Sequence, residues 1–526
     1  MLRKSYDVVI IGGSIGGTVA ALASAKMGKR VVLTEATKWI GGQFTNQAVP
    51  ADEHRWIEEF GCTKSYREFR EAIRRYYREH PYVKDEVKEI KNLNPGNGWV
   101  SRICHEPRVS LKIFYDMLLP YINRGLIKVL TNTEPVFALM NGDAICGIAV
   151  KNAITRELSI LEGKYFLDAT DTGELLPLTN TEYVTGAESK AMHNEPHAAD
   201  DYLKDDMQPI TWVAALEYCA NEDNTIEKPE MYDLFRSYKM SYDDDVILSW
   251  YAPNADTRKK QLFGMFEWKK SSDNVTIPPL FTYRRIIDKS IYKDNFPIND
   301  VTLLNWSQND YFLGNIYDNP NSEYHKYMAK QLTLSLVYWL QTEAPRDDGG
   351  KGYPGLKLRG DLLGTEDGLA LAPYIRESRR IKALYTVVEQ DINADYQKFL
   401  PHYWDTVGVG CYRIDIHMTT VTNSFFYHKA WPFEIPLGAL IPIRTTNLIA
   451  SCKNIGTTHL TNGCFRLHPV EWNIGEVAGY LASYCIDHQV TPKELYRDKT
   501  KVNDFQQFLV KQGIELHWPE DKVSVY

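Results

Sequence analysis

The stretch DVVIIGGSIGGTVAALASAKMGKRVVLTE, residues 7–35, decides the fold. Its first apolar run ends in glycine, as a buried parallel strand does, and a helix rich in small residues follows. The segment KRVVLTE then has the composition of a second strand, so the stretch predicts a βαβ unit. Its turn nearly matches the dinucleotide-binding pattern G-x-G-x-x-G, with Gly12, Ser14 and Gly17 at the three glycine positions.

This turn is suited to hold a phosphate. A helix N-terminus offers free N–H groups and partial positive charge, Gly12 allows a tight turn, and Gly17 allows the helix to pack closely on the sheet. Glu35 ends the second strand, where a carboxylate accepts hydrogen bonds from ribose hydroxyls. An ordinary βαβ turn without a ligand is the alternative, but the order of strand, helix and acid favours a dinucleotide site.

Two further motifs indicate a ligand longer than NAD. WIGGQFTNQ, residues 39–47, contains the pair Gly41 and Gly42, which permits the backbone to lie against a ligand. FLDATDTGELLPL, residues 166–178, is a buried strand that ends in a turn, and ligands of open α/β sheets lie beyond such carboxyl ends. A plain surface turn and an Asx turn are the alternatives for these motifs. Together they favour FAD.

The fourth motif, THLTNGCFRLHPVEWNIGEVAG, spans residues 458–479. A helix that begins near Pro469 points its positive N-terminus at a second negative centre, which in a flavin is the N1–C2=O edge. Arg466 and His468 stand just before this helix, and each is either catalytic or structural.

The predicted fold class is α/β, a Rossmann-like FAD-binding domain with a second mixed α+β substrate or cap domain. The first domain combines a parallel sheet with an antiparallel meander over residues 126–164, followed by a buried strand at Tyr165–Asp168. In the second, residues 325–343 and 373–389 have helical patterns. The predicted boundaries are 1–50, 104–184 and 436–490 for the discontinuous FAD-binding domain, 51–103 for a helical insertion, 185–435 for the substrate or cap domain, and 491–526 for a C-terminal extension.

Bulk properties exclude several classes. The 526 residues carry a net charge of −8, so no basic field favours nucleic acid, and no apolar run of about 20 residues predicts a membrane span. The eight cysteines form no C-x-x-C motif, so neither a zinc ribbon nor a redox pair is expected, and no metal site is predicted. Scattered cysteines are typical of a reducing compartment, which predicts a cytoplasmic location.

Seven segments together resemble the FAD-dependent oxidoreductase family, a bacterial group of the glutathione-reductase-like superfamily that shares its two-domain plan with fumarate reductases. They are GGSIGG, GGQFT, FLDATDTGEL, PYIRESRRI, VGCYRIDIH, IPLGALIP and THLTNGCFRLHP. The resemblance covers most of the chain and implies a non-covalently bound FAD. A common arginine of the family is replaced by Lys453, which puts a cofactor contact there in doubt.

The resemblance and the motifs give one set of cofactor residues. The pyrophosphate is expected over the first turn, the ribose on Glu35, the adenine near Val136, and the flavin near Asn462 and Gly463. The complete predicted set is Gly12, Gly13, Ser14, Gly16, Gly17, Glu35, Gly41, Gly42, Gln43, Val136, Ala169, Thr170, Asp171, Asn462 and Gly463.

The expected chemistry is hydride transfer between a small organic substrate and flavin N5, which needs a base for the accompanying proton. Candidates for the base are His54, His417, His459 and His468. Arg376 is a further catalytic candidate, because it and Arg284 can hold a carboxylate or phosphate, with an internal salt bridge as the alternative.

Other reactions remain open at this point. They are oxygenation, halogenation, isomerisation and the role of a non-catalytic flavin-binding subunit. The Trp, Tyr and Asn residues of the middle region favour a polar or sugar-like substrate. A homo-oligomer is possible, and no second G-x-G-x-x-G predicts a separate NAD(P)H domain.

Overall fold

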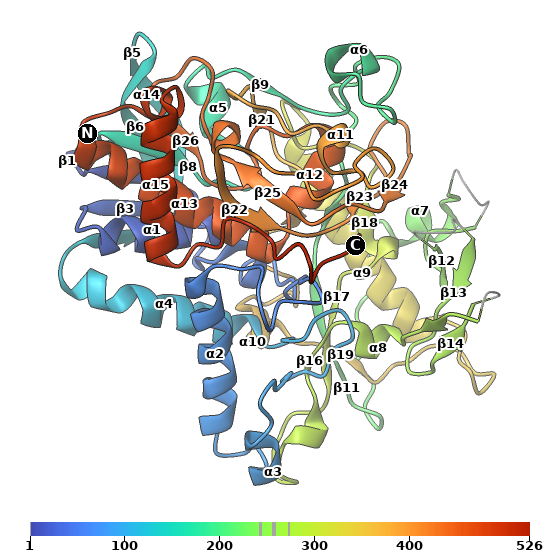
Figure 1. The fold of residues 1–526 in the computed structure, drawn as a ribbon. Helices are drawn as coiled ribbons and strands as arrows, with labels where there is room; N and C mark the ends of the chain where they lie inside the picture. The colour runs from blue at the N-terminus through green and yellow to red at the C-terminus, as the bar shows by residue number, and fades with distance from the viewer. Residues whose placement is uncertain (1, 241–244, 255–258, 272–273) are drawn as a thin grey trace.

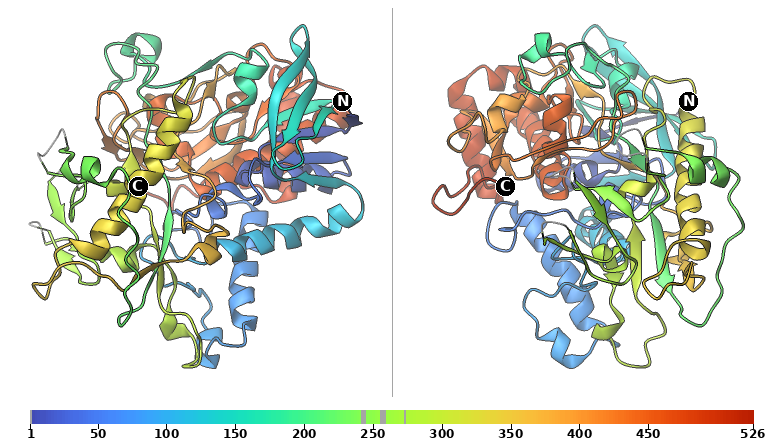
Figure 2. Two further views of the ribbon diagram at one scale, coloured as in Figure 1. Left: turned by 180° about the vertical axis from the view of Figure 1, so that it is seen from behind. Right: turned by 90° about the vertical axis from the view of Figure 1, so that its right-hand side faces the viewer.

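The structure is a computed structural model that describes residues 2–240, 245–254, 259–271 and 274–526. Figure 1 shows that the N-terminal segment, with β1 (Leu2–Ser5) and β3 (Val31–Thr34) in blue, and the C-terminal helices (red) pack together. The green and yellow middle of the chain forms the opposite side of the molecule. The views in Figure 2 show the same arrangement from behind and from the side. The N-terminal βαβ unit is therefore completed by the C-terminal part of the chain.

A five-stranded parallel sheet has the order β26-β8-β2-β3-β4. Its strands are β2 (Val8–Ile11), β3 (Val31–Thr34), β4 (Ile127–Leu130), β8 (Tyr165–Asp168) and β26 (Leu448–Ala450). All but β4 are buried throughout, as apolar runs without alternation require in a sheet covered on both faces. This confirms the predicted parallel sheet.

The strand β4 corrects one expectation. The sequence pattern placed it in the antiparallel meander, but it pairs in parallel with β3. The helix α4 (Pro107–Asn123) lies between the two strands in the chain and supplies the crossover that parallel pairing needs.

Two helices with small residues pack against each other beside this sheet, α1 (Ile15–Lys26) and α13 (His468–His488). A Cβ atom at Gly475 would lie 2.2 Å from the carbonyl oxygen of Gly16, so only glycine permits this approach. Both helices agree with the sequence prediction, and Pro469 lies in the first turn of α13.

A second sheet has the order β1-β7-β6-β5. Its strands are β1 (Leu2–Ser5), β5 (Thr133–Asn141), β6 (Ala144–Asn152) and β7 (Leu158–Glu162). The antiparallel pairs β5–β6 and β6–β7 are the predicted meander, and β1 adds a parallel strand at its edge.

The middle of the chain forms separate small sheets. One has the order β16-β17-β11-β19 and another β18-β10-β20. Their strands are β10 (Ile210–Thr211), β11 (Ala214–Tyr218), β16 (Arg285–Ile287), β17 (Val301–Leu304), β18 (Asp310–Tyr311), β19 (Leu356–Leu358) and β20 (Tyr374–Ile375). The long helix α9 (Ser322–Thr342) contacts β10 and β18 and confirms the helical pattern predicted there.

The helix predicted over residues 373–389 is wrong. This segment forms β20 and, after a short connection, β21 (Arg380–Ile381). Its arginines do not make a solvated helix face, because Arg376 and Arg380 are buried and hold carboxylates of other segments. Long-range ion pairs therefore override the local helical pattern.

The remaining elements are short or peripheral. The strands are β9 (Tyr183–Val184), β12 (Tyr251–Pro253), β13 (Lys260–Leu262), β14 (Lys269–Lys270), β15 (Thr276–Ile277), β22 (Thr406–Gly410), β23 (Ile414–Ile416), β24 (Phe426–His428) and β25 (Phe433–Pro436). The helices are α2 (Lys64–Glu79), α3 (Asp85–Lys88), α5 (Leu175–Leu178), α6 (Lys190–His193), α7 (Tyr232–Ser237), α8 (Leu280–Tyr283), α10 (Gly360–Leu363), α11 (Glu389–Ile392), α12 (His459–Phe465), α14 (Pro492–Tyr496) and α15 (Lys499–Gln512), with short 3₁₀ turns η1 (Gly42–Phe44), η2 (Lys289–Ile291), η3 (Ser307–Asn309) and η4 (Leu437–Leu440). Among the described residues, no helix combines the length and the apolar character needed to cross a bilayer.

Candidate functional site

A cavity of about 500 Å³ lies at the carboxyl edge of the parallel sheet; we call it the cofactor cavity. It is lined by residues at the carboxyl ends of parallel strands and by the first residues of β5. These are Gly12 and Ser14, Thr34–Thr37, Ala169–Thr172 and Thr133–Pro135. Open α/β sheets bind ligands at this edge, so the position is the expected one for a dinucleotide.

The fingerprint turn has the geometry that its glycines allow. Gly12 has a φ of 99°, and a Cβ atom there would lie 2.3 Å from the carbonyl oxygen of Ala169. The Oγ of Ser14 accepts a hydrogen bond of 3.2 Å from the N–H of Gly17 and caps α1. The serine thus replaces the middle glycine of the pattern and stabilises the helix whose N-terminus opens toward the cavity.

Glu35 is buried in the wall of the cofactor cavity. Its carboxylate accepts hydrogen bonds from the N–H groups of Gly13 (3.0 Å) and Thr37 (2.8 Å) and from the amide of Asn46 (3.0 Å). Burial nevertheless raises the pKa of Glu35 to about 7, so a ligand that donates to this carboxylate would favour its charged form.

The glycine pair after Glu35 packs on the fingerprint turn and does not line the cavity. The N–H of Gly41 donates to the carbonyl of Gly13 over 2.7 Å, and a Cβ atom at Gly42 would lie 2.9 Å from the Cα of Ser14. Gln43 is also buried behind the wall and donates to the carbonyl of Arg466. The cavity is lined instead by Asn46 and Gln47, a few residues further along, which the sequence analysis missed.

Beneath the wall lies a buried ion-paired group that surrounds Lys453. Its Nζ is 2.5 Å from Asp171 and 3.2 Å from Glu471, both of which also face Cys452. Burial opposes the charge of Lys453, but these carboxylates outweigh it and raise the pKa of Lys453 well above its ordinary value. The lysine binds acids of the protein, and only Asp171 of this group reaches the cavity.

The remaining predicted cofactor residues divide into two groups. Ala169, Thr170 and Asp171 line the cavity, whereas Gly13, Gly16 and Gly17 pack behind it. Val136 is exposed and does not line the cavity; Thr133–Pro135 do.

Asn462 and Gly463 are buried in α12 and contact other parts of the protein. The amide of Asn462 donates to the carbonyl of Lys453, and Gly463 packs against Asp415. The cavity is also lined by Trp212, Leu371–Pro373, Ile375 and Arg379. The N–H of Ala372 donates to the carbonyl of Asn46, and Arg379 donates to the carbonyl of Thr172.

A second cavity, of about 260 Å³, is lined in part by the residue that directly follows β20. Ile375 lines the cofactor cavity and the next residue, Arg376, lines the second one. Arg284 and His417 also line the second cavity. The structure therefore brings together three residues that the sequence analysis singled out from distant positions.

His417 and Arg376 share one acid. Nδ1 of His417 lies 2.7 Å from Oδ2 of Asp310, and Nη2 of Arg376 lies 2.8 Å from Oδ1 of the same residue. Burial disfavours the charge of Asp310, but Arg376 and His417 outweigh it and lower its pKa. The predicted internal salt bridge of Arg376 is thus present, while the residue also lines the cavity.

The other three candidate histidines line neither of these two cavities, although His459 lines a separate cavity of about 260 Å³ together with Glu188 and Glu195. His54 and His468 are buried against backbone carbonyls, and burial lowers the pKa of each to about 4. His459 is buried against Glu377, whose carboxylate outweighs the effect of burial and raises the histidine's pKa. Packing and internal hydrogen bonds account for these three.

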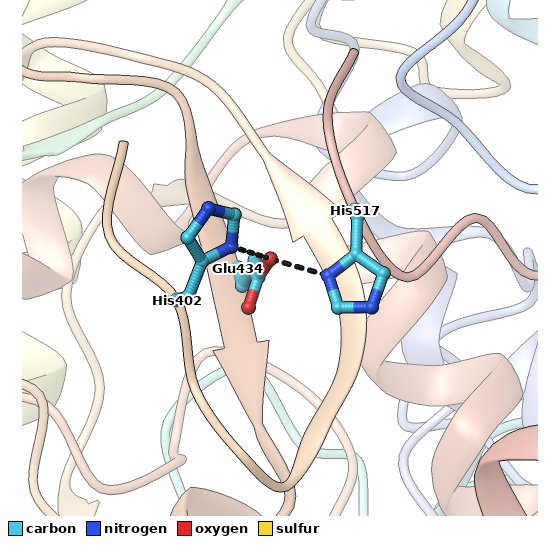
Figure 3. Close-up of side chains that lie close together, drawn as sticks. All are labelled: His402, Glu434 and His517. Atoms are coloured by element: carbon cyan, nitrogen blue, oxygen red, sulfur yellow. Dashed lines mark hydrogen bonds and ion pairs between the residues drawn. The ribbon is translucent and has the colours of Figure 1, made fainter. Parts of the chain in front are cut away.

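A cluster of metal-ligand type lies outside both cavities. Figure 3 shows His402 and His517 on either side of Glu434, whose Oε1 lies 2.8 Å from Nδ1 of the first and 2.7 Å from Nδ1 of the second. Glu434 is buried and both histidines are exposed. Hydrogen bonding accounts for this arrangement, which joins the C-terminal segment to β25.

A comparison with models of known protein families identifies the family of this chain. The model of a family described as FAD dependent oxidoreductase matches residues 7–509. The chain belongs to this family. FAD is therefore its cofactor, and it is an oxidoreductase that acts on a small-molecule substrate.

Individual relatives add little to this assignment. A segment of 43 residues is 46% identical to the soluble pyridine nucleotide transhydrogenases of Mycobacterium bovis and Mycobacterium tuberculosis. The match covers 8% of this chain and 9% of each relative.

Solved flavoprotein structures match only in part. A glycerol-3-phosphate dehydrogenase from Bacillus halodurans complexed with FAD shares 12% identity over 41% of this chain and 40% of its own, with a TM-score of 0.24. A myxobacterial chondrochloren halogenase shares 15% identity over 43% of this chain and 46% of its own, with a TM-score of 0.21.

The residues of the cofactor cavity fit FAD. The N-terminus of α1 suits a pyrophosphate, and the buried carboxylate of Glu35 suits ribose hydroxyls. The cavity also continues to Trp212 and Ile375, which leaves room for more than a mononucleotide.

Proposed function

We propose that this oxidoreductase transfers a hydride between a small organic substrate in the second cavity and the N5 atom of the flavin. The observation that carries the proposal is that two consecutive residues line the two cavities. Ile375, the last residue of β20, lines the cofactor cavity, and Arg376, directly after the strand, lines the second one.

The residues that line the cofactor cavity indicate how FAD would be oriented in it. We place the pyrophosphate at Gly12 and Ser14, the ribose at Glu35 and the adenine toward Thr133–Pro135. The isoalloxazine would then occupy the rest of the cavity, which Ile375 lines next to Arg376 of the second cavity. FAD binds without a covalent bond in this proposal.

His417 is the proton-transfer group of the proposal. FAD supplies a two-electron acceptor at N5 when it is bound. Oxidation of an alcohol or amine also releases a proton, which needs a base within hydrogen-bond reach. Asp310 binds Nδ1 of His417 over 2.7 Å, and Nε2 has a longer contact of 3.5 Å with Asp415. Nε2 is the more weakly held nitrogen and therefore the atom suited to exchange the proton.

The test uses the FAD-loaded protein under anaerobic conditions. Mixing with small alcohols, amines and hydroxy acids should bleach the flavin absorbance, and His417→Ala should slow the bleaching about a hundredfold or more. The matched control His488→Ala replaces an exposed histidine that lines neither cavity and should leave the rate unchanged.

Three outcomes contradict the proposal. An unchanged rate in His417→Ala would exclude His417 as the proton acceptor. If no substrate bleaches the flavin and the reduced protein reduces no acceptor, hydride transfer is wrong. A stable oxygen adduct seen in the spectrum of the reduced protein after mixing with air would favour oxygenation or halogenation instead.

A further inference from the structure

The second cavity contains polar atoms that are buried and have no protein partner within the described chain. They are Nη1 of Arg284, Nε of Arg376 and both amide atoms of Asn305. Asn305 is only 3% exposed, and so is Arg376. Buried donors and acceptors without partners are costly and uncommon in folded proteins, so their gathering around one cavity indicates a polar ligand.

The charged side chains around the second cavity indicate the charge of that ligand. Arg376 is paired with Asp310, and the neighbouring Arg466 is 2.7 Å from Asp415. Arg284 donates its Nε to the carbonyl of Asn305, and no ion pair joins it to a carboxylate of the described residues. Burial opposes the charge of Arg284, but Asp52 is near enough to raise its pKa, although no ion pair joins the two residues. A guanidinium is always charged, so Nη1 of Arg284 remains a charged donor that an anionic ligand can reach in this cavity.

The amide of Asn305 narrows the ligand further. Whichever way the amide is oriented, it offers one donor and one acceptor, and neither has a partner among the described residues. A carboxylate accepts from Arg284 and from the amide NH₂. The amide oxygen then needs a donor on the same ligand, which a hydroxyl or amino group beside the carboxylate supplies.

The rest of the wall and the size of the cavity define the body of the ligand. Phe263, Ile277, Pro278, Tyr283 and Trp306 give an apolar and largely aromatic surface. The volume of about 260 Å³ lies below the roughly 300–1,000 Å³ typical of sites for drug-sized ligands. A small molecule with a hydrophobic side group fits these limits.

We infer that the second cavity binds a small organic carboxylate that carries a hydroxyl or amino group next to the acid and a hydrophobic side group. The inference deepens the proposed function and rests on it for the reaction. For a 2-hydroxy acid, the C–H hydrogen leaves as hydride to flavin N5 and the O–H proton goes to Nε2 of His417. The C–O bond becomes C=O, and the two electrons are on the flavin.

Binding is tested without turnover, so the two proposals can fail separately. The FAD-loaded protein in its oxidised form is titrated by isothermal calorimetry at constant ionic strength with lactate, mandelate, 3-phenyllactate and phenylalanine. Buffer blanks, the uncharged mandelamide and inorganic phosphate are titrated alongside as controls. We expect saturable binding of at least one aromatic acid, at least tenfold tighter than that of mandelamide and of inorganic phosphate.

Substitutions of Arg284 test whether this side chain binds the carboxylate. Arg284→Met should weaken binding of the best acid tenfold or more with an unchanged FAD content, and Arg284→Lys should recover only part of it because the lysine lacks the planar fork. Arg124→Met removes an exposed arginine that lines neither cavity and should leave binding unchanged. The comparison of mandelate with mandelamide needs no variant, so it decides the question even if an Arg284 variant does not fold.

Several results would overturn the inference. They are equal affinities for mandelate and mandelamide, tighter binding of phosphate than of every carboxylate, no heat from any acid, or an unchanged affinity in a folded Arg284→Met. A carboxylate that binds through Arg284 but never bleaches the flavin would support the site and contradict the proposed hydride transfer.

Discussion

The two cavities lined by the consecutive residues Ile375 and Arg376 are built in different ways. The cofactor cavity is lined largely by loops at the ends of parallel strands, and its decisive features are backbone features, such as the positive φ of Gly12. The second cavity is defined by side chains from separate parts of the chain, among them Arg284, Asn305, Arg376 and His417. A site made of backbone is sensitive to any added atom, whereas a site made of side chains is sensitive to the loss of one functional group.

The largest expected effect is at Gly12. Gly12→Ala should abolish FAD binding and lower the free energy of unfolding by more than about 3 kcal/mol, because the new Cβ would lie 2.3 Å from the carbonyl oxygen of Ala169. Gly28→Ala is the matched control, since Gly28 also has a positive φ but open space around its Cβ, and should cost about 1 kcal/mol. Flavin content of the purified proteins and chemical denaturation measure both effects. A Gly12→Ala protein that retains FAD would contradict the backbone account of this cavity.

An intermediate effect is expected at Glu35, a functional group in the otherwise backbone-built cavity. Glu35→Gln should weaken FAD binding roughly tenfold to a hundredfold, as expected for hydrogen bonds to a charged group. Because burial raises the pKa of Glu35 to about 7 and ribose hydroxyls donate best to the ionised form, affinity of the unmodified protein should rise between pH 6 and pH 8.

The pH dependence gives this prediction its control. Titration of the FAD-free protein with FAD, followed by fluorescence, should show no rise with pH in Glu35→Gln, while the exposed Glu157→Gln should behave like the unmodified protein. The same slope in all three proteins would show that another group titrates and that the ribose assignment is wrong.

The smallest effect is expected outside both cavities, at His402. Its hydrogen bond to Glu434 raises the pKa of His402, so its stabilisation is present below the ordinary histidine pKa of about 6.5 and is lost as the pH rises through the higher value of the folded protein. His402→Ala should therefore lower the free energy of unfolding by less than about 1 kcal/mol at pH 5.5 and have little effect at pH 9, because the side chain is half exposed. FAD content and carboxylate binding should not change; a change in either would connect this cluster to the cavities.

The comparison of the cavities explains where prediction from sequence succeeded. The βαβ unit, the strand at Tyr165–Asp168 and the helix from His468 follow from contiguous patterns, and the structure confirms them. Glu35 and the Ala169–Asp171 turn were found in the same way, because strand ends and their following residues are adjacent in the chain. Asn46 and Ile375 lie within quoted motifs, but nothing in those motifs singles them out, and Trp212 lies in no motif at all; long-range packing brings all three to the cavity.

The histidines show the limit of the same approach. His54, His417, His459 and His468 were equal candidates in the sequence, and burial and partners separate them in the structure. His54 and His468 are enclosed by their own contacts and His459 lines a separate cavity, whereas His417 meets Asp310 at the second cavity. The segment around Arg376 was predicted as a helix for a related reason, because its acidic partners come from other segments of the chain and no local pattern reveals them.

The sequence by itself determined the βαβ unit, the dinucleotide turn and the acid at the end of the second strand. These features depend on the conformational freedom of glycine, on apolar runs and on short spacing, all of which are local properties of the chain. Only the tertiary structure decided that Lys453 is enclosed by acids and that Arg284, Asn305, Arg376 and His417 line one cavity. Charges and hydrogen-bond donors acquire their roles from partners that are far away in the sequence, and folding alone brings them together.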